Sequence, residues 1–330
     1  MHNEFYAYSQ EPFGLSPDPR VLFLTEHMEE LLETLVDGIK QRKGFMLLTG
    51  DKGVGKTTLI HHLPSLMGQN IKVIPIYKNY QTIDEMLEFI LKYLRLPPGG
   101  GDKGFMMTQF DEYLTQKSAL DETPVMLIDE AQGLSREVLE DLRLFAAPDP
   151  RKPKYLQEIL VADTGFEERL NSNGLQQLTQ RIAVRCLLRP LNEEESRQYL
   201  EYRLTRVGSN LSQVFTPEAV AFIVRKSKGI PRAINMLGYL ALSAGYALSQ
   251  KKVDTPLLEK VFPLLSGEKP EVLQLPDRAK AGALPPQGSA REKLFDLLAR
   301  SPRVMRISYA LLAYSLVIWV IFLFLNLRGG

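Results

Sequence analysis

The stretch GDKGVGKTT at 50–58 restricts the folds open to this chain more than any other feature. It follows the apolar run GFMLLTG at 44–50 and precedes a helix-length pattern, so it stands between a predicted strand and a predicted helix. Four residues fit the pattern G-x-x-x-x-G-K-[ST]: Gly50, Gly55, Lys56 and Thr57. Glycines let such a loop curl its N–H groups around phosphate oxygens. An incidental glycine-rich turn is the alternative, and the strand–loop–helix context favours nucleotide binding.

The predicted phosphate contacts extend over the whole loop. Lys56 is expected to neutralise the β and γ phosphates of ATP, and the Thr57 hydroxyl is expected to hold Mg²⁺. The helix that begins here adds the positive end of its dipole. The residues predicted to bind the cofactor in this loop are Gly50, Asp51, Lys52, Gly53, Val54, Gly55, Lys56, Thr57 and Thr58.

A second candidate element, VMLIDEAQ, ends an apolar strand in two adjacent carboxylates. We predict that Asp129 binds Mg²⁺, directly or through water, and that Glu130 orients and activates an attacking water. A lone strand-terminal Asp-Glu pair also fits a helix cap beside a solvated charge. Together with the loop at 50–58, the pair favours ATP hydrolysis over binding alone.

Apolar runs alternate with helix-length patterns over the first part of the chain. The predicted strands are 44–50, 71–77, 124–129, 155–163 and 183–188. This alternation predicts an α/β P-loop fold with a parallel sheet flanked by helices, over 1–190. After Pro190 only helices are predicted, at 192–207, 216–228, 231–249 and 254–265, with a Thr cap and a first-turn proline in TPEA. These helices form a predicted helical lid over 191–265.

The end of the chain has a different character. Residues 266–290 are rich in Pro, Gly, Ser and charge, which predicts a flexible linker, and an amphipathic juxtamembrane segment at 291–306 follows. That segment could lie on the lipid surface or extend the next helix. Residues 307–327 carry no formal charge and, as a helix, span roughly 31 Å, close to a bilayer core of about 30 Å. A buried core helix is the alternative.

The charges around this segment predict an orientation. Lys293, Arg300, Arg303 and Arg306 precede it and Arg328 alone follows, which keeps the N-terminal side cytoplasmic. We therefore expect a single-pass membrane protein whose C-terminal end lies on the side of the membrane opposite the cytoplasm. The formal net charge of +1 argues against a broad nucleic-acid-binding face, although it allows a local patch. The lone cysteine, Cys186, lies in an apolar run and is expected to be buried.

Several blocks in order resemble the AAA+ ATPases of the general secretion pathway protein A family, also called ExeA-like. They are FYAYSQEPFGLSPDPRVLFL, GIKQRKGFMLLTGDKGVGKTTL, VMLIDEAQ, LTQRIAVRCLLRPLNEEE and GIPRAINML, over about residues 5–265. The resemblance implies that Arg181 is an arginine finger that reaches a neighbouring subunit's γ-phosphate, and that Arg232 is the sensor 2 arginine of the lid. A structural salt bridge for Arg181 and helix N-terminal packing for Arg232 remain open.

Two departures from the family stand out. Ala162, Asp163 and Thr164 replace the family's usual Gly-Gln-Pro, so a carboxylate occupies the polar sensor 1 position and would repel the γ-phosphate unless Mg²⁺ or a proton compensates. Secretion-pathway members often carry a periplasmic peptidoglycan-binding domain after the span, whereas this sequence stops at Gly330. A direct role at the cell wall is therefore not expected.

The predicted span and the resemblance together imply a membrane-anchored ATPase that uses ATP and Mg²⁺. It is expected in a bacterial inner membrane as a single-pass protein, with its C-terminus periplasmic. It is expected to form a homo-oligomeric ring or arc and to drive assembly or remodelling of an envelope system, such as secretion, pilus or polysaccharide export. Its expected partners are inner-membrane proteins of that machinery and the lipid bilayer, with nucleic acid not expected. A DNA-binding ATPase like the transposition helpers and a non-hydrolysing nucleotide-gated adaptor are the alternatives.

Overall fold

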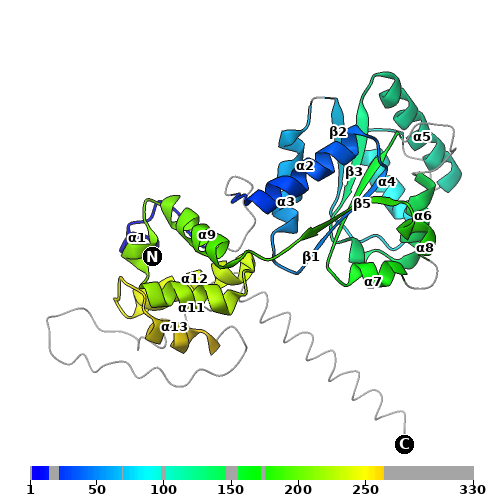
Figure 1. Cartoon of the computed structure of the whole chain (residues 1–330). Helices are drawn as coiled ribbons and strands as arrows, with labels where there is room; N and C mark the ends of the chain where they lie inside the picture. The colour runs from blue at the N-terminus through cyan, green and yellow to red at the C-terminus, as the bar shows by residue number, and fades with distance from the viewer. Residues whose placement is uncertain are drawn as a thin grey trace, which may run out of the picture.

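A parallel sheet of five strands forms the centre of the α/β part of the molecule (Figure 1). The computed structural model describes residues 2–14, 22–68, 70–97, 102–145, 155–171 and 175–263. The strands are β1 (Phe45–Gly50), β2 (Ile71–Ile76), β3 (Thr123–Ile128), β4 (Gln157–Ala162) and β5 (Ile182–Leu188), in the order β2-β3-β4-β1-β5. The predicted α/β fold with a parallel sheet is therefore confirmed, and each strand begins and ends within two residues of its predicted range.

The register of the sheet aligns the carboxyl ends of the strands. Thr49 of β1 pairs with Ala162 of β4, and Gly50 pairs with Leu188 of β5. All strand pairs are parallel, so the residues that follow β1, β3 and β4 meet at one edge. Ligands of open α/β sheets bind at this edge.

Helices cover both faces of the sheet because the central strands are apolar on both. Met46 and Leu48 of β1 belong to one buried cluster, and Phe45 and Leu47 belong to the other. The first face is covered by α2 (Glu26–Lys40) and α3 (Lys56–His62). The second face is covered by α4 (Ile83–Tyr93), α5 (Lys103–Ala119), α6 (Arg136–Phe145), α7 (Phe166–Asn171) and α8 (Gln176–Thr179).

The segment 102–110, whose role the sequence leaves open, begins a helix. The Asp102 side chain accepts hydrogen bonds from the backbone N–H groups of Gly104 and Phe105, which caps α5 at its N-terminus. Inside the helix, Met106 and Phe110 are buried in the second cluster. The segment therefore contributes to the core of the α/β part.

After β5 the described chain is helical, with α9 (Glu193–Thr205), α10 (Leu211–Val214), α11 (Pro217–Ser227), α12 (Pro231–Ala247) and α13 (Thr255–Val261). Thr216 caps α11 and Pro217 occupies its first turn, as predicted from TPEA. The N-terminal helix α1 (His2–Tyr6) packs here too, where the Tyr6 hydroxyl donates to the Leu242 carbonyl at 3.4 Å. The predicted boundaries of a separate lid stay a prediction.

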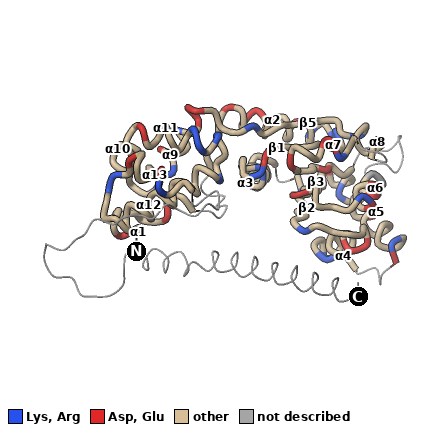
Figure 2. Tube along the Cα trace, turned by 90° about the horizontal axis from the view of Figure 1, so that it is seen from below, with Lys and Arg blue, Asp and Glu red and all other residues tan. Residues whose placement is uncertain are grey.

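No helix among the described residues is long and apolar enough to cross a membrane. The predicted linker at 266–290, juxtamembrane segment at 291–306 and membrane span at 307–327 all lie outside the described residues. Cys186 is buried, as predicted, and burial raises the pKa of its thiol to about 11. Figure 2 shows Lys and Arg interspersed with Asp and Glu along the described chain.

Candidate nucleotide-binding site

The predicted phosphate loop, residues 51–55, connects β1 to α3, and its glycines allow the backbone conformation that it adopts. Gly53 and Gly55 have φ angles of +90° and +107°, in the left-handed region that other residues rarely adopt. A Cβ atom on Gly50 would lie 2.6 Å from the Leu188 carbonyl oxygen of the neighbouring strand. The glycine spacing in the sequence therefore matches the conformation that the loop adopts.

Lys56 is held inside the curve of this loop. Its side chain is 7% exposed, and its Nζ atom donates to the backbone carbonyls of Gly50 at 2.7 Å and Asp51 at 3.1 Å. Burial lowers the pKa of Lys56, and nearby carboxylates oppose that shift: Glu130, Asp129, Asp163 and Asp51. The ammonium group is thus preorganised beside the loop that is predicted to surround phosphate.

The side chains of Thr57 and Asp129, which are both predicted to hold Mg²⁺, are in contact. The Thr57 hydroxyl donates to Asp129 Oδ2 at 2.8 Å, and the other Asp129 oxygen accepts from the Glu130 N–H at 2.9 Å. Asp129 is nearly buried, and its own N–H bonds the carbonyl of Ile76 at the end of β2. A hydroxyl and one carboxylate, completed by phosphate oxygens and waters, form the hard-oxygen set that Mg²⁺ prefers.

These donors fit Mg²⁺ bound with a nucleotide rather than a permanent metal site. Among the described residues, no cluster of three or more His, Cys, Asp or Glu side chains could hold a metal ion. Mg²⁺ that arrives with a triphosphate needs only one or two protein carboxylates. Thr57 and Asp129 are the residues that would hold it.

Glu130 is set at the mouth of the site by an unusual backbone conformation. Its φ angle of +53° lies in the left-handed region, which is uncommon for a residue with a side chain. Its carboxylate accepts a hydrogen bond from the Gln132 side-chain amide. Arg169 donates to the backbone carbonyls of Gln132 and Leu134, so α7 fixes the turn that carries Glu130.

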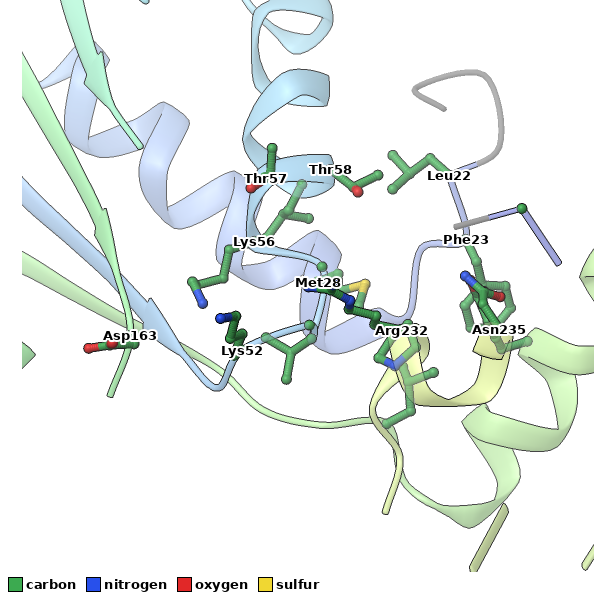
Figure 3. Close-up of a pocket in the computed structure, with 18 of the residues that line it drawn as sticks. Leu22, Phe23, Met28, Lys52, Lys56, Thr57, Thr58, Asp163, Arg232 and Asn235 are labelled. Atoms are coloured by element: carbon green, nitrogen blue, oxygen red, sulfur yellow. The ribbon is translucent and has the colours of Figure 1, made fainter. Parts of the chain in front are cut away.

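Asp163, the residue at the predicted sensor 1 position, lines the same cavity. Its backbone N–H donates to the Gln132 side-chain oxygen at 3.3 Å, and the next residue, Thr164, donates to the Asp51 carboxylate at 3.0 Å. Figure 3 shows the Asp163 carboxylate pointing away from Lys52 and Lys56. The end of β4 is therefore tied both to the turn after β3 and to the phosphate loop.

Arg232 joins the loop from the helical part of the molecule. Its backbone N–H donates to the Gly53 carbonyl at 3.2 Å, and a Cβ atom on Gly53 would lie 2.9 Å from the Arg232 Cβ. Its side chain lines the cavity between Lys52 and Asn235 (Figure 3). The N-terminus of α12 thus rests directly on the phosphate loop.

Arg181 is the one predicted site residue that the fold keeps away from the loop of its own chain. It precedes Ile182, which pairs with Phe45 at the amino end of β1, whereas the loop follows Gly50 at the carboxyl end. At about 3.3 Å per residue, the length of β5 puts roughly 20 Å between these edges. Burial raises the pKa of Glu158, and the positive charge of Arg181 offsets part of that rise, so Arg181 lies close enough to this buried carboxyl group to act on it.

One cavity of about 490 Å³ connects the phosphate loop to the helical part, within the roughly 300–1,000 Å³ usual for ligand pockets. It is also lined by residues that no sequence motif marked: Phe23, Met28, Leu191, Tyr199, Arg203 and Asn235. Asn235 follows Arg232 by three residues in GIPRAIN, which on a helix places both on one face. That spacing is the signal that could have found it.

Comparison with known proteins identifies the fold and a relative. Residues 39–170 match the family model described as AAA domain. Over 256 residues, 77% of this chain, the sequence is 34% identical to general secretion pathway protein A of Aeromonas hydrophila. Because those residues cover 46% of that relative, the chain spans about half its length.

Two solved structures share the fold. Cdc6p from Pyrobaculum aerophilum superposes with a TM-score of 0.60 at 16% identity, covering 74% of this chain and 68% of that one. The ORC2 protein of Aeropyrum pernix, in ADPNP–ADP complexes, gives a TM-score of 0.57 at 17% identity, covering 76% and 70%. The resemblance found in the sequence is confirmed: this chain contains an AAA domain and is related to general secretion pathway protein A.

Proposed function

We propose that this chain is an ATPase that binds ATP with Mg²⁺ and hydrolyses it. The observation that carries the proposal is the meeting of Lys56, Thr57, Asp129 and Glu130 at one end of a 490 Å³ cavity. The nucleotide complexes of the Aeropyrum pernix protein, which has the same fold, support a nucleotide as the ligand.

Each side chain has a defined task in the proposed reaction. The backbone N–H groups of residues 50–58 bind the phosphates, Lys56 neutralises their negative charge, and Thr57 and Asp129 hold Mg²⁺, which stabilises charge on the transferred phosphoryl group. Glu130 accepts a proton from water that attacks the γ-phosphate. Arg232 links the bound phosphate to α12, so that hydrolysis changes the contact between the loop and the helical part.

We further propose that copies of this chain assemble into a ring or arc and share active sites. Arg181 lies at the far edge of the sheet from its own loop, so it can stabilise transition-state charge only on a nucleotide held by another subunit. In the isolated chain the charge of Arg181 acts on the buried Glu158. This is compatible with the proposed role if assembly draws the guanidinium towards the neighbouring site.

The test separates binding from turnover. Glu130→Gln preserves the shape of the side chain and removes its basicity, so it should bind ATP normally and lose about 10²–10⁴-fold in turnover. Lys56→Ala should lose ATP binding itself. Turnover in the Glu130→Gln protein equal to that of the unmodified protein would overturn the proposed role of Glu130. ATP binding without Mg²⁺-dependent turnover in the unmodified protein would favour the nucleotide-gated adaptor.

The cellular role that we propose rests on the uncharged segment 307–327 and on the relationship to general secretion pathway protein A. The segment would anchor the ATPase to a bacterial inner membrane, with residues 1–306 cytoplasmic, beside partner proteins of an envelope system that it assembles or remodels. Confinement to the membrane raises the effective concentration of the ATPase near such partners. Membrane fractionation tests the anchor: the full chain should sediment with membranes, and a variant with three charges introduced into 307–327 should not.

A further inference from the structure

The cavity holds a chain of hydrogen bonds that the proposed hydrolysis does not use. On α9, Arg203 Nη1 donates to the Tyr199 hydroxyl oxygen at 3.3 Å, and the Tyr199 hydroxyl donates to Asn235 Oδ1 on α12 at 3.0 Å. Tyr199 and Asn235 are buried, 7% and 8% exposed. All three side chains line the cavity that also contains the phosphate loop.

Arg203 fixes the donor and acceptor roles along this series of hydrogen bonds. A guanidinium group has only N–H donors, so the Tyr199 oxygen must accept from Arg203, and the phenolic hydrogen is left for Asn235. Burial raises the pKa of Tyr199, so the phenol keeps that hydrogen at neutral pH. Asn235 therefore presents its amide oxygen to Tyr199, and its NH₂ group is left as a donor for the cavity.

Arg203 is held by two backbone carbonyls, and this fixes the position of the hydrogen bonds from Arg203 to Tyr199 and from Tyr199 to Asn235. Its Nε atom donates to the Pro12 carbonyl at 2.6 Å, and Nη2 donates to the Gly14 carbonyl at 3.4 Å. These contacts tie α9 to the N-terminal segment. Within the described residues, the Asn235 side chain makes no hydrogen bond other than the one to Tyr199, so its NH₂ group has no protein acceptor there.

The surroundings of Asn235 suit a flat, partly apolar group. Phe23 packs against Tyr199 with ring centroids 5.6 Å apart, and Met28 and Leu191 also line the cavity. Figure 3 shows Phe23 and Asn235 on one side of the cavity and Lys56 on the other, with Arg232 between them. A nucleotide with its phosphates at Lys56 would extend its base towards Asn235.

We propose that Asn235 recognises the base of the nucleotide, donating its amide N–H to a ring nitrogen of adenine. This inference rests on the proposed function. Adenine has an unprotonated N1 that accepts a hydrogen bond, whereas guanine carries N–H donors at N1 and N2 on the same edge. A donor facing a donor leaves both groups unsatisfied in a buried site, so the geometry selects ATP over GTP.

The experiment measures the ratio of the dissociation constants for GTP and ATP. The full chain in detergent, carrying Glu130→Gln to prevent turnover, is titrated with each nucleotide and Mg²⁺ by calorimetry. The parent protein should prefer ATP by about 10-fold to 100-fold. Asn235→Asp retains the shape and replaces the donor with an acceptor, so the preference should fall to near unity or reverse. Added negative charge weakens both nucleotides alike and cancels in the ratio.

Two further variants separate base recognition from a loss of structure. Tyr199→Phe removes the hydroxyl that orients Asn235, so the ratio should fall while binding through the phosphates persists. Ser243→Ala, a buried change on the same helix two turns away, should leave the ratio unchanged. An equal affinity of the parent protein for ATP and GTP, or an unaltered ratio in Asn235→Asp, would overturn the inference alone. Failure of the parent protein to bind either nucleotide would overturn the proposed function and this inference with it.

Discussion

Glu158 gives the sharpest prediction about stability, because it places a carboxyl group in the middle of the sheet. It pairs with Phe45 on one side and Met126 on the other, is 0% exposed, and neither of its oxygens has a hydrogen-bond partner among the described residues. Burial raises its pKa well above 4.5, and the charge of Arg181 offsets part of that shift. The folded state therefore favours protonated Glu158.

The contribution of Glu158 to the free energy of unfolding decreases as the pH rises. A raised pKa in the folded state means that the contribution of Glu158 to stability is fully present below the unfolded pKa and is lost as the pH rises towards the folded pKa. In that window the free energy of unfolding falls by about 1.4 kcal/mol per pH unit on account of this group. Glu158→Gln is neutral at every pH, so it removes this slope.

The assay is urea unfolding of the full chain in detergent, followed by circular dichroism at several pH values. The stability of Glu158→Gln relative to the unmodified protein should increase by about 1.4 kcal/mol for each pH unit above about pH 5, until the pH reaches the folded pKa of Glu158. If burial of the amide introduced by Glu158→Gln is unfavourable, it lowers the stability of the variant by the same amount at every pH. The change of the stability difference with pH is then unaffected. A difference independent of pH would refute the reasoning, because it would show that Glu158 has the same protonation in the folded and unfolded states.

Three further predictions concern the loop and its supports. Gly53→Ala should lower the free energy of unfolding by roughly 1–3 kcal/mol and weaken ATP binding, because it strains a positive φ and crowds Arg232. Gly208→Ala is the control: its φ is similar and no atom lies near its Cβ position, so it should lower stability without affecting ATP binding. Thr57→Ala should raise the Mg²⁺ concentration needed for half-maximal turnover, and Thr57→Ser should restore it. Arg169→Leu leaves two turn carbonyls without these donors, so thermal unfolding should show a loss of about 1–3 kcal/mol and turnover should fall with it.

The elements that the sequence predicted well are those with local signals. The phosphate loop was found because left-handed glycines and a lysine at fixed spacing are a short-range requirement, and Gly53 and Gly55 adopt that conformation. The strands were found because each is a mainly apolar run of six or seven residues, and β1 and β4 are buried along their whole length. Thr57 and Asp129 were predicted to hold the same Mg²⁺, and the structure brings their side chains into a hydrogen bond because parallel strands end at one edge of the sheet.

The missed features depend on contacts between distant parts of the chain. Tyr199 and Asn235 are 36 residues apart, and Arg203 bonds a carbonyl 191 residues away, so no local pattern marks them as one unit. The sequence predicted Glu158 to lie in a strand, and only the register of the sheet shows that its carboxyl group is buried. The segment 102–110 carries glycine beside a proline- and glycine-rich stretch, which obscures the Asp102 cap of a helix.

Mixing two inactive variants tests the central claim, a shared active site, most directly. Glu130→Gln retains Arg181, and Arg181→Ala retains Glu130, so each alone should be inactive. Mixed in equal amounts, they should restore about a quarter of the sites, those in which an intact Glu130 faces an intact Arg181 across a head-to-tail interface. Recovered ATP turnover at about that level would support the account. Full activity of Arg181→Ala alone, or no recovery from two folded and assembled variants, would contradict it.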